Sequence, residues 1–165
     1  MKSFIAAILL LTIGSLGAQT GARKDRADDP DMKEIRDYRL TMSNMQKFVA
    51  ATKSISGDAA SVRCMKDKSP GNAPTLDAGE KILNGCAETS ALIKKAGLAP
   101  REYVVMSGAI MADFLVVGMK KQGTIKEYPP SILPENAAFI EQNFDKLSAM
   151  LAPVMQGDKS EKEDQ

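Results

Sequence analysis

Apolar side chains recur at steps of three and four residues along most of this chain, which is the spacing of one face of an α-helix. Between Asp31 and about Ile55 the pattern continues until Gly57, a residue type that often ends a helix. Five helices are predicted in this way, over residues 31–55, 58–67, 75–95, 100–121 and 135–155. No alternating run is flanked by hairpin turns. The sequence therefore predicts an all-α single domain, with four long helices and one short helix packed as a bundle or an orthogonal helical array.

The helix predicted over 100–121 is the most apolar of the five. Its one charged residue between positions 104 and 119 is Asp113, so we expect this helix to be the most buried element. The stretch 104–119 is too short to cross a bilayer comfortably. On a helical projection Asp113 aligns with Glu102 and Lys120. This alignment favours a solvent-facing polar stripe over a buried carboxylate with a raised pKa.

The first residues of the chain have the order of a secretory signal: Lys2, an apolar centre over 4–11, and small residues from Ser15 onward. The apolar run is shorter than the about 20 residues of a membrane anchor. We therefore expect residues 1–18 to be a leader, with cleavage between positions 17 and 22. The protein is then exported to the periplasm or outside the cell, with no membrane span in its mature form. Behind the leader we expect a flexible N-terminal arm, a helical domain and a disordered charged tail, over residues 19–30, 31–156 and 157–165.

Charge and composition exclude several classes of function. The chain has 22 basic and 21 acidic residues, and removal of Lys2 with the leader balances them, so there is no basic surplus for nucleic acid or anionic lipid. Histidine is absent, which excludes a Ser-His-Asp triad and a histidine zinc site. Tryptophan is absent as well. No Gly-rich phosphate loop or calcium-loop spacing occurs, so we expect no catalytic residues of a known type, no resident metal and no cofactor.

The two cysteines, Cys64 and Cys86, are 22 positions apart, and in an oxidising compartment we expect them to form one disulfide. A redox-active pair is the alternative, but such pairs usually have the Cys-x-x-Cys spacing that this chain lacks. In a tight pair of antiparallel helices, Cys86 would lie about 12 Å along the axis from Cys64, beyond the ~7 Å that a disulfide allows between Cα atoms. The bond then requires residues 65–75 to run back along the later helix as an extended strap.

Methionine is frequent, with ten in the chain. Thioethers are soft ligands for Cu(I), so an exported copper-binding protein is one hypothesis. The favoured interpretation is that the methionines fill an irregular helical core. The residues considered are Met42, Met45, Met106, Met111, Met150 and Met155.

A proline segment, Tyr128-Pro129-Pro130, lies between the last two predicted helices. Stiff segments that cross a helical core often shape clefts. We therefore place the candidate ligand cleft at Tyr103, Tyr128, Pro129 and Pro130.

Two short motifs resemble a group of uncharacterised small exported all-helical bacterial proteins: Gly97-Leu98-Ala99-Pro100-Arg101-Glu102-Tyr103, and Pro134-Glu135-Asn136 with Phe139, Asn143 and Leu147. The resemblance covers the last third of the mature chain. It implies an exported helical protein and brings no assigned activity or functional residues. With no catalytic motif in the chain, we expect a non-enzymatic interaction or binding module of the periplasm or cell envelope, its partner an unknown protein or small ligand. A small-ligand carrier with a cavity in the bundle is the alternative, and an unusual hydrolase is a third hypothesis.

Overall fold

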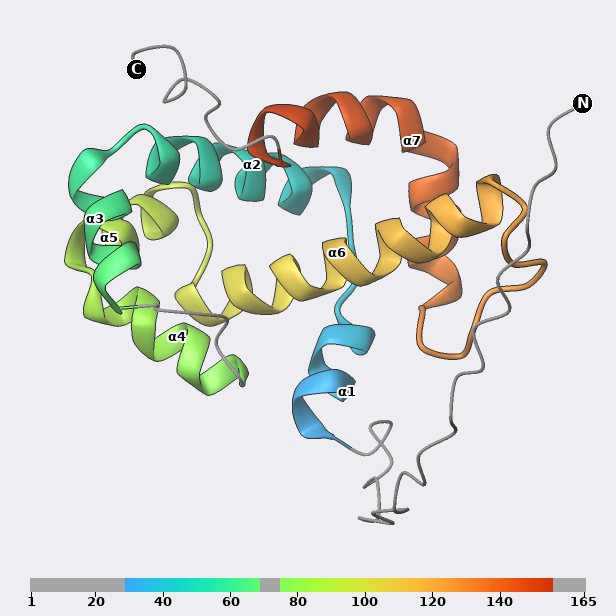
Figure 1. Cartoon of the computed structure of the whole chain (residues 1–165), viewed down its shortest axis with the longest axis horizontal. Coiled ribbons are helices and arrows are strands. Elements are labelled where there is room, and N and C mark those ends of the chain that lie inside the picture. The colour runs from blue at the N-terminus through green and yellow to red at the C-terminus, as the bar shows by residue number, and fades with distance from the viewer. Residues whose placement is uncertain (1–28, 69–74, 156–165) are drawn as a thin grey trace, which may run out of the picture.

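The computed structural model describes residues 29–68 and 75–155, which form seven α-helices and, within these two segments, no strand. The helices are α1 (Pro30–Asp37), α2 (Met42–Ser56), α3 (Ala59–Lys68), α4 (Leu76–Gly85), α5 (Ala87–Lys95), α6 (Pro100–Lys121) and α7 (Pro134–Met155). They pack as one helical array (Figure 1), which confirms the all-helical single domain. The predicted leader over 1–18, positions 19–28 of the predicted arm and the predicted tail over 157–165 lie outside the described residues.

The single long helix predicted over 31–55 was wrong, because the chain forms two helices there. α1 ends at Asp37, Tyr38 has extended backbone dihedrals, and α2 begins behind Thr41. The Thr41 hydroxyl accepts a hydrogen bond from the backbone N–H of Asn44 (3.3 Å), whose side-chain oxygen accepts one from the backbone N–H of Thr41 (2.8 Å). This reciprocal pair is a capping box that starts a new helix. Apolar spacing continues across the break and conceals it in the sequence.

The helix predicted over 75–95 is also divided, at Cys86 between α4 and α5. The backbone of Cys86 is extended, with φ −110° and ψ 96°, and it follows Asn84-Gly85, a dipeptide typical of turns. α4 therefore ends at Gly85, and α5 begins at Ala87. The prediction of four long helices and one short one is thus replaced by two long helices, α6 and α7, and five shorter ones.

The structure confirms the predicted disulfide between Cys64 on α3 and Cys86, whose Cα atoms lie 5.9 Å apart. At the end of α3, Lys68 donates a hydrogen bond to the backbone oxygen of Gly85 (2.6 Å). α3 therefore ends beside the C-terminal end of α4, which brings the two cysteines together. The predicted extended strap was wrong over residues 65–68, because α3 continues as a helix to Lys68. Positions 69–74 of the strap lie outside the described residues.

Several predicted helix ends are confirmed. The Asp58 carboxylate accepts a hydrogen bond from the backbone N–H of Ser61 (2.7 Å) at the start of α3, and the Thr75 hydroxyl caps α4 in the same way. Gly97 and Gly123 follow α5 and α6 with φ of +83° and +75°. A side chain would strain the backbone in this left-handed conformation, which explains glycine at both helix ends.

α6 runs through the middle of the molecule, with α2 and the later part of α7 on one side and α1 and α4 on the other, while the first part of α7 crosses the C-terminal end of α6 (Figure 1). Among the described residues it is the one helix long and apolar enough to cross a membrane by length and composition, a test that central helices of soluble domains also pass. Only 33% of its most apolar stretch is buried. α6 therefore carries apolar surface that the domain core does not cover.

Buried side chains of α6 and of the helices packed around it form the core. Its fully buried members include Met45, Ile93, Met106, Val117, Ile140 and Leu147.

Candidate functional site: an apolar groove on the central helix

The prediction that Asp113 faces solvent was wrong, because this residue of the stripe lies in the protein interior, whereas Glu102 and Lys120 are half-buried. Asp113 is only 4% exposed. Each stripe residue has a side-chain partner on another element: Glu102 accepts from the Tyr38 hydroxyl (2.9 Å), Asp113 accepts from Asn136 Nδ2 (2.8 Å), and Lys120 donates to Glu141 Oε1 (3.1 Å). The bond from Asn136 satisfies the buried Asp113, which burial would otherwise leave unpaired.

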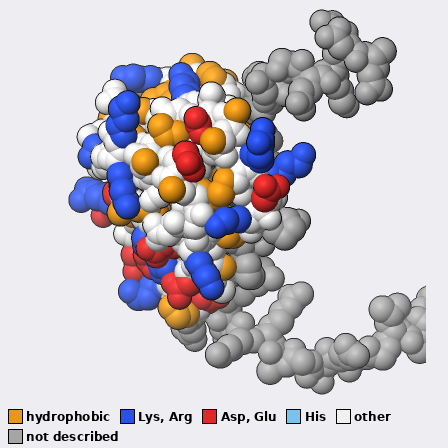
Figure 2. Space-filling model, turned by 90° about the vertical axis from the view of Figure 1, so that its left-hand side faces the viewer, with side chains coloured by type: hydrophobic (Ala, Val, Ile, Leu, Met, Phe, Trp, Pro, Cys, Tyr) orange, Lys and Arg blue, Asp and Glu red, His pale blue; other side chains and the backbone are white. Residues whose placement is uncertain are grey.

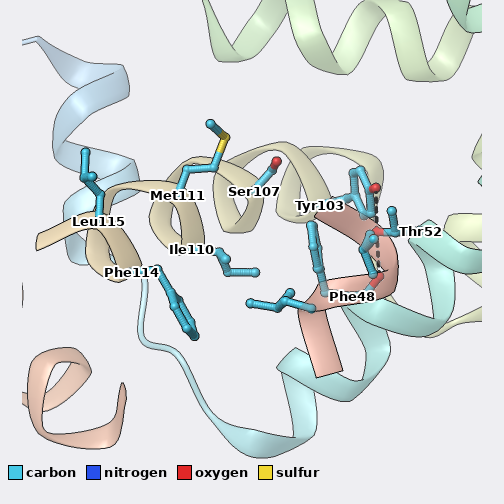
Figure 3. A pocket seen from close by; sticks show the side chains of 10 residues that line it. Phe48, Thr52, Tyr103, Ser107, Ile110, Met111, Phe114 and Leu115 are labelled. Carbon is cyan, nitrogen blue, oxygen red and sulfur yellow. Dashed lines mark hydrogen bonds between the residues drawn. The ribbon is translucent and has the colours of Figure 1, made fainter. Parts of the chain in front are cut away.

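Apolar side chains occupy the outward side of α6 in place of the stripe. Met111 is 71% exposed and Leu115, one turn later, is 65% exposed. Ser107, one turn before Met111, points in the same direction (Figure 3). A solvent-facing row that includes two large apolar residues is therefore present on the central helix.

A groove of about 710 Å³ lies beside this row, between α2, α6 and α7. Ile110 and Phe114 project from α6 in a different direction from Met111 and Leu115 (Figure 3). The two pairs therefore line different sides of the groove. The lining residues are Phe48, Thr52, Tyr103, Ser107, Ile110, Met111, Phe114, Leu115, Leu151 and Val154. The groove is therefore continuous with the exposed apolar row.

Tyr103 forms one end of the groove. Its ring stacks on Phe48 with centroids 4.9 Å apart, and its hydroxyl lies 2.8 Å from the Thr52 hydroxyl. Since Thr52 donates its own proton to the backbone oxygen of Phe48 (2.8 Å), Tyr103 is the donor to Thr52. Burial raises the pKa of the Tyr103 phenol.

An aromatic pair supports the other end of the groove. Phe114 lies against Phe144 of α7, with ring centroids 5.9 Å apart, and the ammonium group of Lys121 lies 4.4 Å from the centroid of Phe144. Such contacts hold the Phe114 ring in place between α6 and α7. The shape of the groove is thus set by packed side chains at both ends.

The lining contains no carboxylate, amine or thiol, and its polar groups are the hydroxyls of Thr52, Tyr103 and Ser107. Such a surface can bind apolar groups, and it supplies no acid, base or charged metal ligand. Within residues 29–68 and 75–155, no cluster of three or more His, Cys, Asp or Glu side chains could hold a metal ion. Of the methionines considered above, Met45 and Met106 are fully buried in the core.

The residues of the predicted cleft have different surroundings. Tyr103 lines the groove, whereas Pro130 lines a second hollow beside Asp113. Tyr128 donates a hydrogen bond to Glu141 (2.5 Å) and lies under the Lys120 ammonium group, which is 4.0 Å from its ring centroid. Burial and the Glu141 bond raise the pKa of Tyr128 to about 12. The half-buried Pro129 follows Tyr128 in the chain.

The buried residue that the sequence analysis did not single out as important is Asn136, which is 0% exposed. Its side-chain oxygen accepts a hydrogen bond from the backbone N–H of Leu40 (2.9 Å), and its Nδ2 donates to the backbone oxygen of Tyr38 (2.9 Å) and to Asp113 (2.8 Å). Burial raises the pKa of Asp113 to about 6, and the bond from Asn136 partly opposes that shift. The sequence feature that could have indicated a buried polar partner here is the Thr41 capping box, because a helix break leaves backbone groups that need a hydrogen-bond partner.

Comparison with protein families, with curated proteins and with solved structures finds no match for this chain.

Proposed function

We propose that this protein is an exported, non-enzymatic binding module whose groove on α6 binds an apolar segment of a protein partner. The observation that carries the proposal is the exposure of Met111 and Leu115, at 71% and 65%, on the central helix of the domain. Contiguous exposed apolar surface on a soluble protein typically marks an interaction site. Export is supported by the leader pattern over 1–18 and by the resemblance described above.

The groove has the length of a short helical segment. Its lining on α6 extends from Tyr103 to Leu115, a distance of about 18 Å at the helical rise per residue. An amphipathic partner helix of about three turns would match this length and could place its apolar face against Phe114 and Met111. By contrast, the face formed by α3, α4 and α5 carries lysine, arginine and acidic side chains between scattered apolar spots (Figure 2).

A small-ligand carrier is the second candidate, and the size of the groove favours it. A volume of about 710 Å³ lies within the range of roughly 300–1,000 Å³ that is typical of small-molecule sites. The two candidates differ in the ligand: a carrier would enclose an acyl chain or similar molecule, whereas the binding module would accept a peptide helix across the open row.

The test is a fluorescence titration of the full chain with the neutral apolar dye N-phenylnaphthylamine, followed by displacement. We expect the dye to bind and an amphipathic Leu/Lys helical peptide to displace it. Substitutions M111K and L115K should each weaken both steps by about tenfold or more. V62K is the matched control, since Val62 is also an exposed apolar residue, at 46%, but lies on α3 outside the groove.

The outcome separates the candidates. Displacement by decanoate but not by the peptide would establish the carrier in place of the binding module. Absence of dye binding, or an equal loss in V62K and M111K, would overturn both.

A further inference from the structure

A second hollow, of about 370 Å³, lies between α1, α6 and the segment that connects α6 to α7. Its apolar lining includes Met32, Ile35, Val116 and Pro130. Asp113 is the most buried residue of the lining, and Met32, at 43% exposed, lies toward solvent. The hollow therefore combines a largely apolar lining with one buried acidic residue.

The carboxylate of Asp113 has no cationic partner. None of the ion pairs among the described residues includes it, and its hydrogen bond comes from the neutral amide of Asn136. Removal of a charge from water without an opposite charge is costly. An asparagine at position 113 could accept the same hydrogen bond, so the negative charge is not needed to hold Asn136.

A positive charge lines the same hollow. The Nε atom of Arg36 lies 3.0 Å from one oxygen of Asp37, and Lys33 lies 2.9 Å from the other. Two cations thus share one carboxylate, and the hydrogen bond of Arg36 to Asp37 uses Nε rather than the terminal nitrogens. A guanidinium group has five donors, so Nη1 and Nη2 can still bind a carboxylate.

We propose that this hollow is a binding site for a small aliphatic zwitterion, of which an amino acid with an unbranched apolar side chain is the simplest form. Its ammonium group pairs with Asp113, its carboxylate group pairs with Arg36, and its side chain packs against Ile35 and Val116. The volume lies at the lower end of the range for ligand sites, which suits a molecule of this size. The site is separate from the groove, since the two share no lining residue.

Calorimetric titration of the full chain with norleucine, hexanoate and pentylamine tests the proposal, because each of the last two lacks one charged group of norleucine. We expect norleucine to bind at least about tenfold more tightly than either. D113N should reduce norleucine affinity to the level of hexanoate, and R36Q should reduce it to the level of pentylamine. R39Q is the matched control, since Arg39 is exposed in the same part of the chain and does not line the hollow.

A second measurement remains decisive if a variant does not fold. The pKa of Asp113 is about 6, and Arg36 is the one charged side chain that shares its hollow. Norleucine affinity of the unmodified protein should therefore fall as the pH is lowered through about 6, whereas hexanoate affinity should not fall. Equal affinities for the three compounds, no saturable binding at millimolar concentration, or a norleucine affinity independent of pH would overturn the site. M111K should leave norleucine binding unchanged, because Met111 does not line this hollow. A failure of the proposed zwitterion site can therefore be distinguished from a failure of the groove.

Discussion

The Nδ2 atom of Asn136 on α7 lies 2.8 Å from the Oδ2 atom of Asp113 on α6, in a bond that is fully buried. Through its other bonds Asn136 also holds the backbone of Tyr38 and Leu40, where α1 gives way to α2. One amide therefore connects two helices and the link between two others. This connection fixes which side of α6 faces the interior.

The charge of Asp113 should destabilise the fold at neutral pH. Its folded-state pKa of about 6 exceeds the ordinary value of 3.8, so the folded protein holds this proton more tightly than the unfolded chain. The resulting penalty is absent below pH ~3.8 and fully present above pH ~6. We expect D113N to raise the free energy of unfolding by up to about 3 kcal/mol near pH 7 and to change it little near pH 4. Urea unfolding at the two pH values measures this, and a destabilised D113N near pH 7 would contradict it.

Removal of the Asn136 side chain should loosen the link between α1 and α2. N136A leaves the buried backbone N–H of Leu40 without its acceptor, so we expect a loss of about 2–4 kcal/mol in the free energy of unfolding. Amide hydrogen exchange at Leu40 should accelerate at the same time. The matched control is N143A on the same helix, because Asn143 donates only to the backbone of Phe139 one turn earlier. Equal effects of the two substitutions would argue against the connecting role.

The disulfide should contribute measurably to stability. For a bond between residues 22 positions apart, the chain-entropy estimate is about 3 kcal/mol. We expect the C64S/C86S double variant to lose about this much in urea unfolding. The intact mass of the protein should increase by two hydrogen atoms on reduction, and no increase would show that the thiols are unpaired.

Two glycines of α6 should respond oppositely to alanine. A Cβ atom at Gly118 would meet nothing within 4 Å, whereas one at Gly108 would lie 2.9 Å from Cδ1 of Ile35 on α1. G118A should therefore stabilise the protein by about 0.5–1 kcal/mol through helix propensity. At G108A the contact with Ile35 should cancel that gain or reverse it. Thermal unfolding of the two variants compares them directly, and an equal rise for both would show that α1 does not pack closely on Gly108.

The exposed apolar residues of α6 should be dispensable for folding. We expect M111K and L115K to change the free energy of unfolding by less than about 0.5 kcal/mol, as is usual for surface substitutions. M106A on the same helix should cost about 2–5 kcal/mol, because Met106 is fully buried. Chemical unfolding measures all three. A large loss in M111K would indicate that this residue supports the fold and not an interface.

Local sequence signals predicted much of the secondary structure. Asp58 and Thr75 were recognised as caps because their oxygens can accept from backbone N–H groups nearby in the chain. The disulfide followed from the presence of two cysteines and the expected compartment. The breaks at Tyr38 and Cys86 were missed because apolar spacing runs through both, and spacing alone does not register a change of helix direction.

The tertiary structure alone decided which side of α6 is buried. Apolar residues surround most of this helix, so its composition establishes a central position but leaves its rotation open. The rotation depends on partners distant in the sequence: Asn136 for Asp113, Tyr38 for Glu102 and Glu141 for Lys120. The hydrogen bond from Asn136 offsets part of the cost of burying Asp113, and Met111 and Leu115 are left in solvent. The sequence by itself thus determined a helical protein with one apolar central helix, and the long-range hydrogen bonds determined which apolar side chains of that helix are left in solvent.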